Sequence, residues 1–118
     1  MKKIIYKIHD RDEWLKAKSA GVFTGAAVDI SDGYIHFSLA DQVIETANKY
    51  FRGQVGLLLI AIDADQLDSN LLKYETSRGG ALFPHLYGPL DTSSIIKEWS
   101  LALNPDGSHQ FPPLKDSL

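Results

Sequence analysis

The segment Val55–Ile62 is continuously apolar, and it constrains the fold more than any other part of the sequence. An apolar run without alternation is typical of a central strand that is buried on both faces of a sheet. Asp63 and Asp65 end the run. Its longest aliphatic part, Leu57–Ile62, is far too short to cross a bilayer, so a membrane is not an expected partner. The sequence therefore predicts a soluble domain built around one central strand.

A strand and a helix are predicted before this run, near the start of the chain. Ile4–Ile8 is rich in β-branched and aromatic residues at alternate positions, which favours a strand. Asp10 and Glu13 have the spacing of a capping box, and Gly21 supplies a stop. A short helix is therefore predicted between Asp10 and Gly21. The next stretch, Val22–Asp32, has no clear period and is predicted to be a loop.

A second strand and a second helix follow. Tyr34–Ser38 alternates, with Ile35 and Phe37 pointing toward the core. Ser38 is expected to cap the helix Asp41–Phe51. The apolar residues of this helix fall on one stripe, formed by Ala40, Val43, Ile44, Ala47, Tyr50 and Phe51.

The second half of the chain is predicted to be mostly extended. Leu71–Glu75 and His85–Tyr87 are short strands, separated by the loop Thr76–Pro84. Asp91–Leu103 fits either a helix stripe or one face of a strand, and its β-branched pair favours the strand. From about Asn104 the chain is expected to be irregular.

These elements predict an α+β fold in which two helices pack on a mainly antiparallel sheet. The chain has 118 residues, 44% of them hydrophobic, which suits a single domain over residues 1–118. No cysteine is present, and this excludes disulfides, thiolate catalysis and cysteine-ligated metals. No His-Glu-x-x-His or comparable spacing occurs, so no metal is expected.

Charge and the N-terminal sequence bear on partners and location. The formal net charge of −3 gives no field for gathering nucleic acid, which is therefore not an expected partner. Lys7, His9 and Asp10 interrupt any signal-peptide core, so a cytoplasmic protein is expected. The sequence does not indicate an oligomeric state.

The first candidate for chemistry is the segment Gly33–Ser38, which places a histidine in the middle of a strand. His36 lies on the face away from Ile35 and Phe37. Histidine can donate, accept or act as a general base near neutral pH, so His36 is a candidate catalytic group. The alternative is a partly buried structural histidine that is hydrogen-bonded to a neighbouring loop.

The second candidate is the segment Ser77–Pro89, which is dense in polar and aromatic residues. Arg78 supplies a cation beside the flexible backbone amides of Gly79 and Gly80. This combination is suited to binding a phosphate. Phe83 offers an aromatic surface on which a flat ring could stack. His85 and Tyr87, two residues apart in an extended stretch, face the same way. The alternative is that the glycines only form turns and the arginine only a surface ion pair.

Together these segments resemble a small bacterial family, the domain of unknown function 952 (DUF952), from Ile4 to about Pro112. The resemblance rests on the strings Ile5–Ile8, Asp32–Ser38, Gln42-Val43, Thr46-Ala47, Ser77–Gly80 and Phe83–Leu90. It implies a fold similar to that of ADP-ribosyltransferases, which cleave the nicotinamide–ribose bond of NAD.

The resemblance also implies roles for individual residues. In that superfamily three strands supply the site, and the matching candidates here are Tyr6 or Lys7 in the first, His36 with Ser38 in the second, and Glu75 or His85 in the third. Tyr6 and Lys7 stand where the superfamily has a histidine or an arginine. The nicotinamide would contact His36 and Tyr87 or Phe83, and the pyrophosphate would contact Arg78, Gly79 and Gly80.

Three functions are consistent with these features. The first is an ADP-ribosyltransferase-like enzyme, or an NAD-dependent relative that removes phosphate, with NAD or a related nucleotide as substrate. The second is a noncatalytic module that binds a nucleotide or another anionic metabolite in the same pocket. The third is an interaction protein in which His36 and His85 are hydrogen-bonded inside the fold.

Overall fold

The computed structural model describes residues 3–117, with the backbone alone at Arg78. Within this range the strands are β1 (Ile4–Asp10), β2 (Val22–Phe23), β3 (Ile35–His36), β4 (Leu57–Asp63), β5 (Leu72–Thr76), β6 (Leu82–Leu86), β7 (Leu90–Asp91) and β8 (Ile95–Ser100). The α-helices are α1 (Arg11–Ala20), α2 (Ala27–Asp32) and α3 (Val43–Tyr50). Short 3₁₀ turns, η1 (Ala64–Gln66), η2 (Arg78–Gly80) and η3 (Thr92–Ser94), complete the described elements.

The strands form two three-stranded antiparallel sheets and one short antiparallel pair. The first sheet has the order β1-β4-β8, the second has the order β3-β6-β5, and β2 pairs with β7. The two sheets are joined where Tyr6 and Ser38 exchange both backbone hydrogen bonds at 2.8 Å. The predicted α+β class with mainly antiparallel pairing is confirmed, and the join brings the strand with His36 beside β1.

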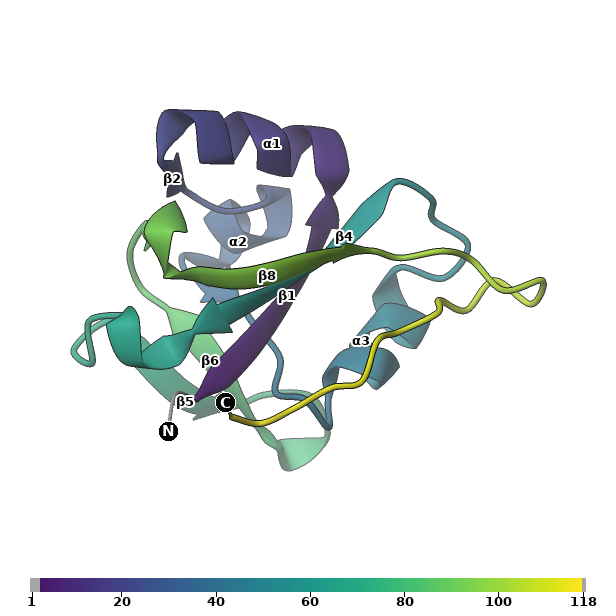
Figure 1. Ribbon diagram of the computed structural model, residues 1–118. Coiled ribbons are helices and arrows are strands. Elements are labelled where there is room, and N and C mark those ends of the chain that lie inside the picture. The colour runs from purple at the N-terminus through teal and green to yellow at the C-terminus, as the bar shows by residue number, and fades with distance from the viewer. Residues whose placement is uncertain (1–2, 118) are drawn as a thin grey trace.

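β4 is the central strand of the first sheet, as the apolar run predicts. Every residue from Leu57 to Asp63 is buried. Val55 is 74% exposed, so the strand begins two residues later than the apolar run. The two faces of the sheet are covered by different helices, with α1 on one side and α3 on the other (Figure 1).

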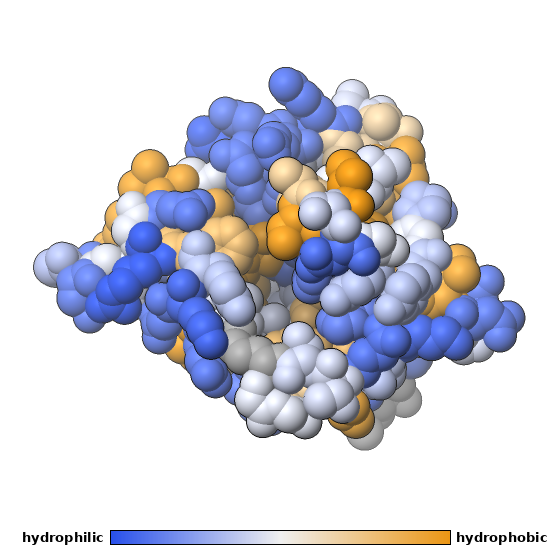
Figure 2. Space-filling model, turned by 180° about the vertical axis from the view of Figure 1, so that it is seen from behind, coloured by the Kyte–Doolittle hydropathy of each residue, from blue (hydrophilic) through white to orange (hydrophobic). Residues whose placement is uncertain are grey.

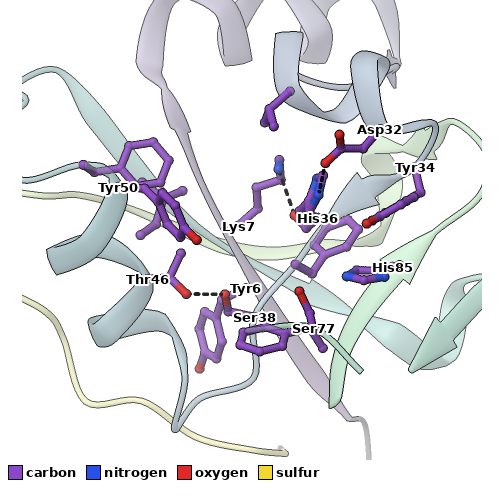
Figure 3. A pocket seen from close by; sticks show the side chains of 15 residues that line it. Tyr6, Lys7, Asp32, Tyr34, His36, Ser38, Thr46, Tyr50, Ser77 and His85 are labelled. Atoms are coloured by element: carbon purple, nitrogen blue, oxygen red, sulfur yellow. Dashed lines mark hydrogen bonds and ion pairs between the residues drawn. The ribbon is translucent and has the colours of Figure 1, made fainter. Parts of the chain in front are cut away.

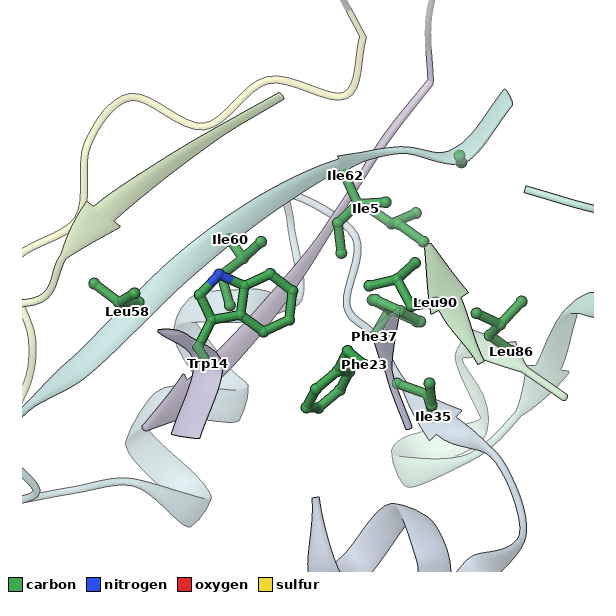
Figure 4. Packing of buried hydrophobic residues seen from close by; sticks show 11 residues of the cluster. Ile5, Trp14, Phe23, Ile35, Phe37, Leu58, Ile60, Ile62, Leu86 and Leu90 are labelled. Carbon is green, nitrogen blue, oxygen red and sulfur yellow. The ribbon is translucent and has the colours of Figure 1, made fainter. Parts of the chain in front are cut away.

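The core divides into two clusters because successive residues of β4 point to opposite faces. On one face Trp14 of α1 packs with Leu58 and Ile60, and its indole lies 5.2 Å from the ring of Phe23 (Figure 4). On the other face Val43 and Ala47 of α3 join Tyr6 and Leu59, with further residues of the C-terminal tail packed against them.

The capping signals of the first helix are confirmed. The Asp10 side chain accepts a hydrogen bond from the Glu13 backbone N–H at 3.0 Å. Gly21 ends the helix in the left-handed conformation, with φ at 83°. The predicted strand over Leu71–Glu75 and the strand reading of Asp91–Leu103 are also confirmed, by β5 and β8.

The prediction of a loop over Val22–Asp32 is wrong, and the structure has three helices where two were expected. β2 forms only because a distant segment, β7, pairs with it. α2 is stabilised by Asp29, whose carboxylate accepts a hydrogen bond from the Ala26 N–H at 2.7 Å. Gly25 makes room for this residue, since a Cβ there would lie 2.9 Å from the Asp29 Cβ.

The prediction that Ser38 caps the following helix is also wrong. The backbone of Ser38 is extended because it bonds to Tyr6, and its hydroxyl lies 3.2 Å from that of Thr46. Instead the Gln42 side chain accepts from the Leu39 N–H, and α3 begins at Val43. Ile44 and Tyr50 of the predicted apolar stripe are exposed.

The C-terminal tail is irregular, as predicted, but it is attached to the fold. Lys115 accepts a hydrogen bond from the Tyr6 hydroxyl through its backbone oxygen, at 3.0 Å. The Ile4 N–H donates to the backbone oxygen of Asp116 at 2.9 Å. The tail therefore runs back past α3 to the start of β1 (Figure 1). Over residues 3–117, no helix has the length and apolar character needed to cross a membrane.

Candidate functional site

A pocket of about 520 Å³ lies between α3 and the strands β3 and β6, with β1 behind it (Figure 3). From the side opposite that of Figure 1, the surface is hollowed near its middle, with hydrophobic atoms beside the hollow (Figure 2). The lining residues are Tyr6, Lys7, Ile8, Val28, Asp32, Tyr34, His36, Phe37, Ser38, Thr46, Tyr50, Phe51, Ser77, Phe83 and His85. Its volume is in the range of small-molecule sites.

Two histidines lie side by side on one wall of this pocket. His36 and His85 are directly opposite each other in the β3–β6 pair, and their ring centroids are 5.5 Å apart. The ring of Tyr34 lies against both, at 4.6 Å from His36 and 4.2 Å from His85. The three rings therefore form one aromatic cluster (Figure 3).

His36 lies between two carboxylates of α2. Its Nδ1 is 2.6 Å from Asp29 Oδ1, and its Nε2 is 3.0 Å from Asp32 Oδ2. Each ring nitrogen therefore faces a carboxylate oxygen of the same helix. Asp32 is 44% exposed and lines the pocket, whereas Asp29 is 1% exposed.

Asp29 is the centre of a buried polar network. Besides the His36 ring, it accepts from the backbone N–H groups of Ala26 and His36. The ammonium group of Lys7 lies 3.1 Å from Asp29 Oδ2 and donates to the His36 carbonyl at 2.8 Å. A buried carboxylate with this many donors is stabilised in its ionised form.

The pKa values of the pair follow from burial and contacts. Burial opposes ionisation of Asp29, but the hydrogen bonds from His36 and the charge of Lys7 outweigh it, and the pKa of Asp29 falls well below its usual value. Burial lowers the pKa of Lys7, while the charge of Asp29 opposes that effect. The Asp29 carboxylate is therefore ionised at neutral pH.

We expect Asp29 to stay ionised in the folded protein from about pH 5 to pH 3, the range in which an ordinary aspartate titrates. Because its pKa is lower in the folded state than in the unfolded state, the unfolded state takes up the proton first. The contribution of Asp29 to stability is therefore complete above about pH 4 and is lost as the pH falls further. An NMR titration of its carboxyl carbon measures this directly, and a midpoint near pH 4 would contradict it.

His85 belongs to a second, more exposed network. Its Nδ1 lies 2.9 Å from Glu75 Oε1, and the Tyr87 hydroxyl donates to the same oxygen at 2.6 Å. These bonds, with that from Tyr87 the stronger influence, lower the pKa of Glu75. The bond to Glu75 raises the pKa of Tyr87 to about 12. Among the described residues, no partner is found for His85 Nε2, the nitrogen on the other side of the ring from Nδ1.

The rest of the pocket lining has aromatic and hydroxyl groups. Tyr50 and Phe51 come from the end of α3, and Phe83 comes from β6. The hydroxyls of Ser38 and Thr46 face each other, and Thr46 lies below Tyr50 in the view of Figure 3. A ligand in the pocket would therefore meet both flat apolar rings and polar ring edges.

A family model described as "protein of unknown function (DUF952)" matches residues 8–98. The chain belongs to the DUF952 family. The match runs from β1 to β8 and includes every pocket-lining residue except Tyr6 and Lys7.

Solved structures show the same fold. The crystal structure of protein CC0527 from Caulobacter crescentus is 52% identical, covering 91% of this chain and 93% of that chain, with a TM-score of 0.86. The solution NMR structure of CC0527 is also 52% identical, covering 91% of both chains, with a TM-score of 0.81. None of the curated proteins matches the sequence.

Most residues that the sequence singled out in this DUF952 chain lie at or beside the pocket. Lining residues among them are Tyr6, His36, Ser38, Phe83 and His85. Glu75 and Tyr87 are not on the pocket wall and reach it through His85. Gly79 and Gly80 form the turn after the lining residue Ser77, and the Gly80 N–H already donates to the Ser77 carbonyl. The side chain of Arg78 lies outside the described part of the structure.

Sequence reasoning missed the two aspartates that flank His36. Asp29 and Asp32 are three residues apart, so a helix places both on one side. Only a prediction of α2 would have revealed this spacing. In the part of the chain that the structure describes, no group of three or more acidic or histidine side chains is placed to hold a metal ion.

Proposed function

We propose that the pocket binds NAD or a related nucleotide and that the protein breaks the bond between the ribose and its planar base. The proposal rests on the sequence resemblance to ADP-ribosyltransferases, which itself stays a prediction. One observation of the site supports it best. A carboxylate, Asp32, and a histidine, His85, whose Nε2 has no partner among the described residues, line the same cavity together with several aromatic rings.

The aromatic lining suits the base. Tyr50, Phe51 and Phe83 offer faces on which a flat ring packs. Lys7 is the only lysine or arginine among the described lining residues, and its charge is paired with Asp29. The pocket therefore fits the nicotinamide and ribose, and the phosphates would lie outside it, toward the turn at Arg78–Gly80.

Asp32 is the group suited to the positive charge that develops on the ribose. When the bond from the ribose C1′ to the ring nitrogen breaks, its electron pair leaves with the base, and the ribose becomes oxocarbenium-like. A carboxylate fixed beside that centre stabilises it by its charge. Asp32 is exposed to the pocket, and one of its oxygens lies 3.0 Å from His36 Nε2, a contact that keeps the carboxylate in place.

His85 is suited to activate the group that attacks C1′. In the neutral tautomer that donates Nδ1–H to Glu75, Nε2 keeps a lone pair. It would take the proton from water, or from an acceptor hydroxyl or amine, as that group bonds to C1′. Glu75 would then stabilise the imidazolium that forms, as the carboxylate does in a carboxylate–histidine pair.

The test is incubation of the purified protein with NAD, with nicotinamide release followed by chromatography and NAD binding followed by calorimetry. Turnover that is lost in Asp32→Asn supports the proposal. Saturable binding without turnover would replace it with the second candidate, a noncatalytic nucleotide-binding module. Neither binding nor turnover at millimolar NAD would overturn both.

A further inference from the structure

We infer that His36 is a positioning residue, which aims the Asp32 carboxylate into the pocket and does not itself act on the ligand. The inference rests on the proposed function and assigns a role to a residue that the sequence suggested as catalytic. It follows from the fact that both ring nitrogens of His36 already face carboxylates, Nδ1 that of Asp29 and Nε2 that of Asp32.

His36 is anchored to buried groups at three points. Asp29 Oδ1 accepts from its ring Nδ1 at 2.6 Å and from its backbone N–H at 3.1 Å. Its carbonyl accepts from the Lys7 ammonium at 2.8 Å. Since Lys7 and Asp29 are both buried, the ring is attached to one of the most constrained parts of the protein.

Two neighbouring aromatic rings also contact the His36 ring. Tyr34 lies over one face, and His85 approaches edge-on from β6. The charged groups that face the imidazole are Asp29 and Asp32 from α2, while Lys7 from β1 bonds to the His36 carbonyl. Rotating the ring would break its bonds to both carboxylates, so no ring nitrogen is left for a ligand.

Asp32 needs such support. It is the last residue of α2, its side chain is 44% exposed, and the next residue, Gly33, is in the left-handed conformation that ends the helix. An unsupported aspartate at such a place samples several rotamers. The close contact with His36 Nε2, which lies 3.0 Å from Asp32 Oδ2, selects one of them. A misplacement of about 1 Å in a reacting group can cost about 100-fold in rate.

Two substitutions separate positioning from direct action. His36→Gln places an amide N–H near the position of Nε2 and can keep the bond to Asp32. His36→Asn places its amide near Nδ1 and keeps only the bond to Asp29. We expect nicotinamide release by His36→Gln within about 10-fold of wild type, and release by His36→Asn about 100-fold slower through kcat, as with Asp32→Asn.

The double variant His36→Asn/Asp32→Asn gives the decisive comparison. If His36 acts only through Asp32, the double variant is no slower than Asp32→Asn alone, because the two losses are the same loss. Multiplied losses, or equal losses in His36→Gln and His36→Asn, would overturn the inference.

A double-mutant cycle on the same variants, measured by melting temperature, does not require the protein to turn over NAD. A decrease in the double variant that is smaller than the sum of the single decreases supports the bond between His36 and Asp32, and additive decreases overturn it. If wild-type protein does not turn over NAD, the proposed function fails. The melting cycle then still decides whether His36 fixes Asp32.

Discussion

Replacing Asp29 with alanine is expected to lower the free energy of unfolding by about 3–5 kcal/mol, because it leaves the buried Lys7 ammonium without its partner. The same change removes the acceptor for the Ala26 N–H and for the backbone and ring of His36. Each buried donor left unsatisfied adds to the loss. Urea unfolding at pH 7 measures the effect.

Asp32→Ala is the matched control, since it removes a carboxylate from the same helix. This aspartate is 44% exposed and bonds only at one edge of the His36 ring, so we expect a loss of about 1 kcal/mol or less. Equal losses in the two variants would show that burial of the Lys7–Asp29 pair does not determine the stability of this region.

Replacing His85 with asparagine is expected to slow nicotinamide release by about 100- to 10,000-fold, the usual contribution of a general acid–base group. Asparagine can still donate to Glu75 in place of Nδ1–H, so the site keeps its shape, but it has no counterpart to Nε2. Single-turnover measurement with saturating NAD isolates the chemical step.

His109→Gln is the control for this experiment. His109 is also buried, but it lies in the C-terminal tail, where its Nε2 contacts the Gln54 carbonyl at 2.9 Å, and it does not line the pocket. Glutamine can keep that contact, so turnover is expected to be unchanged. A comparable loss in both histidine variants, or full activity in His85→Asn, would remove His85 from the proposed mechanism.

Much of the framework could be predicted because its signals are local. The apolar run that becomes β4 needs burial on both faces whatever its neighbours are, and Asp10 and Gly21 mark the ends of α1 through their own backbone geometry. The alternation of His85 and Tyr87 also predicted that they face the same way, and both bond to Glu75.

The missed elements depend on contacts that are distant in the sequence. β2 has two residues and exists only through its pairing with β7, and α2 is a six-residue helix with no apolar period. Ser38 has the chemistry of a helix cap, but its backbone is committed to pairing with Tyr6. Such a competition between local preference and a partner 32 residues away is not visible in one sequence.

The most consequential error of the sequence-based prediction concerned which acidic residue lines the site. The resemblance suggested Glu75 as the carboxylate of the site, and the structure places Glu75 behind His85, outside the pocket wall. Asp32, the carboxylate on the wall, is the first residue of the string Asp32–Ser38 that carried the resemblance, and it ends the segment predicted to be a loop. Its orientation depends on α2 and on His36, neither of which a pattern of residue types specifies.

The bond between Ile4 and Asp116 makes the described chain nearly a closed ring. When the two ends of a chain lie together, the termini can be moved to another loop without changing how the helices and strands pack. A short linker joining residues 3 and 117 would let the chain be reopened elsewhere, for instance in the exposed turn at Asp68–Asn70 between β4 and β5, with every pocket residue still in its place. A protein of this shape is therefore suited to circular permutation and to insertion as a module inside another chain.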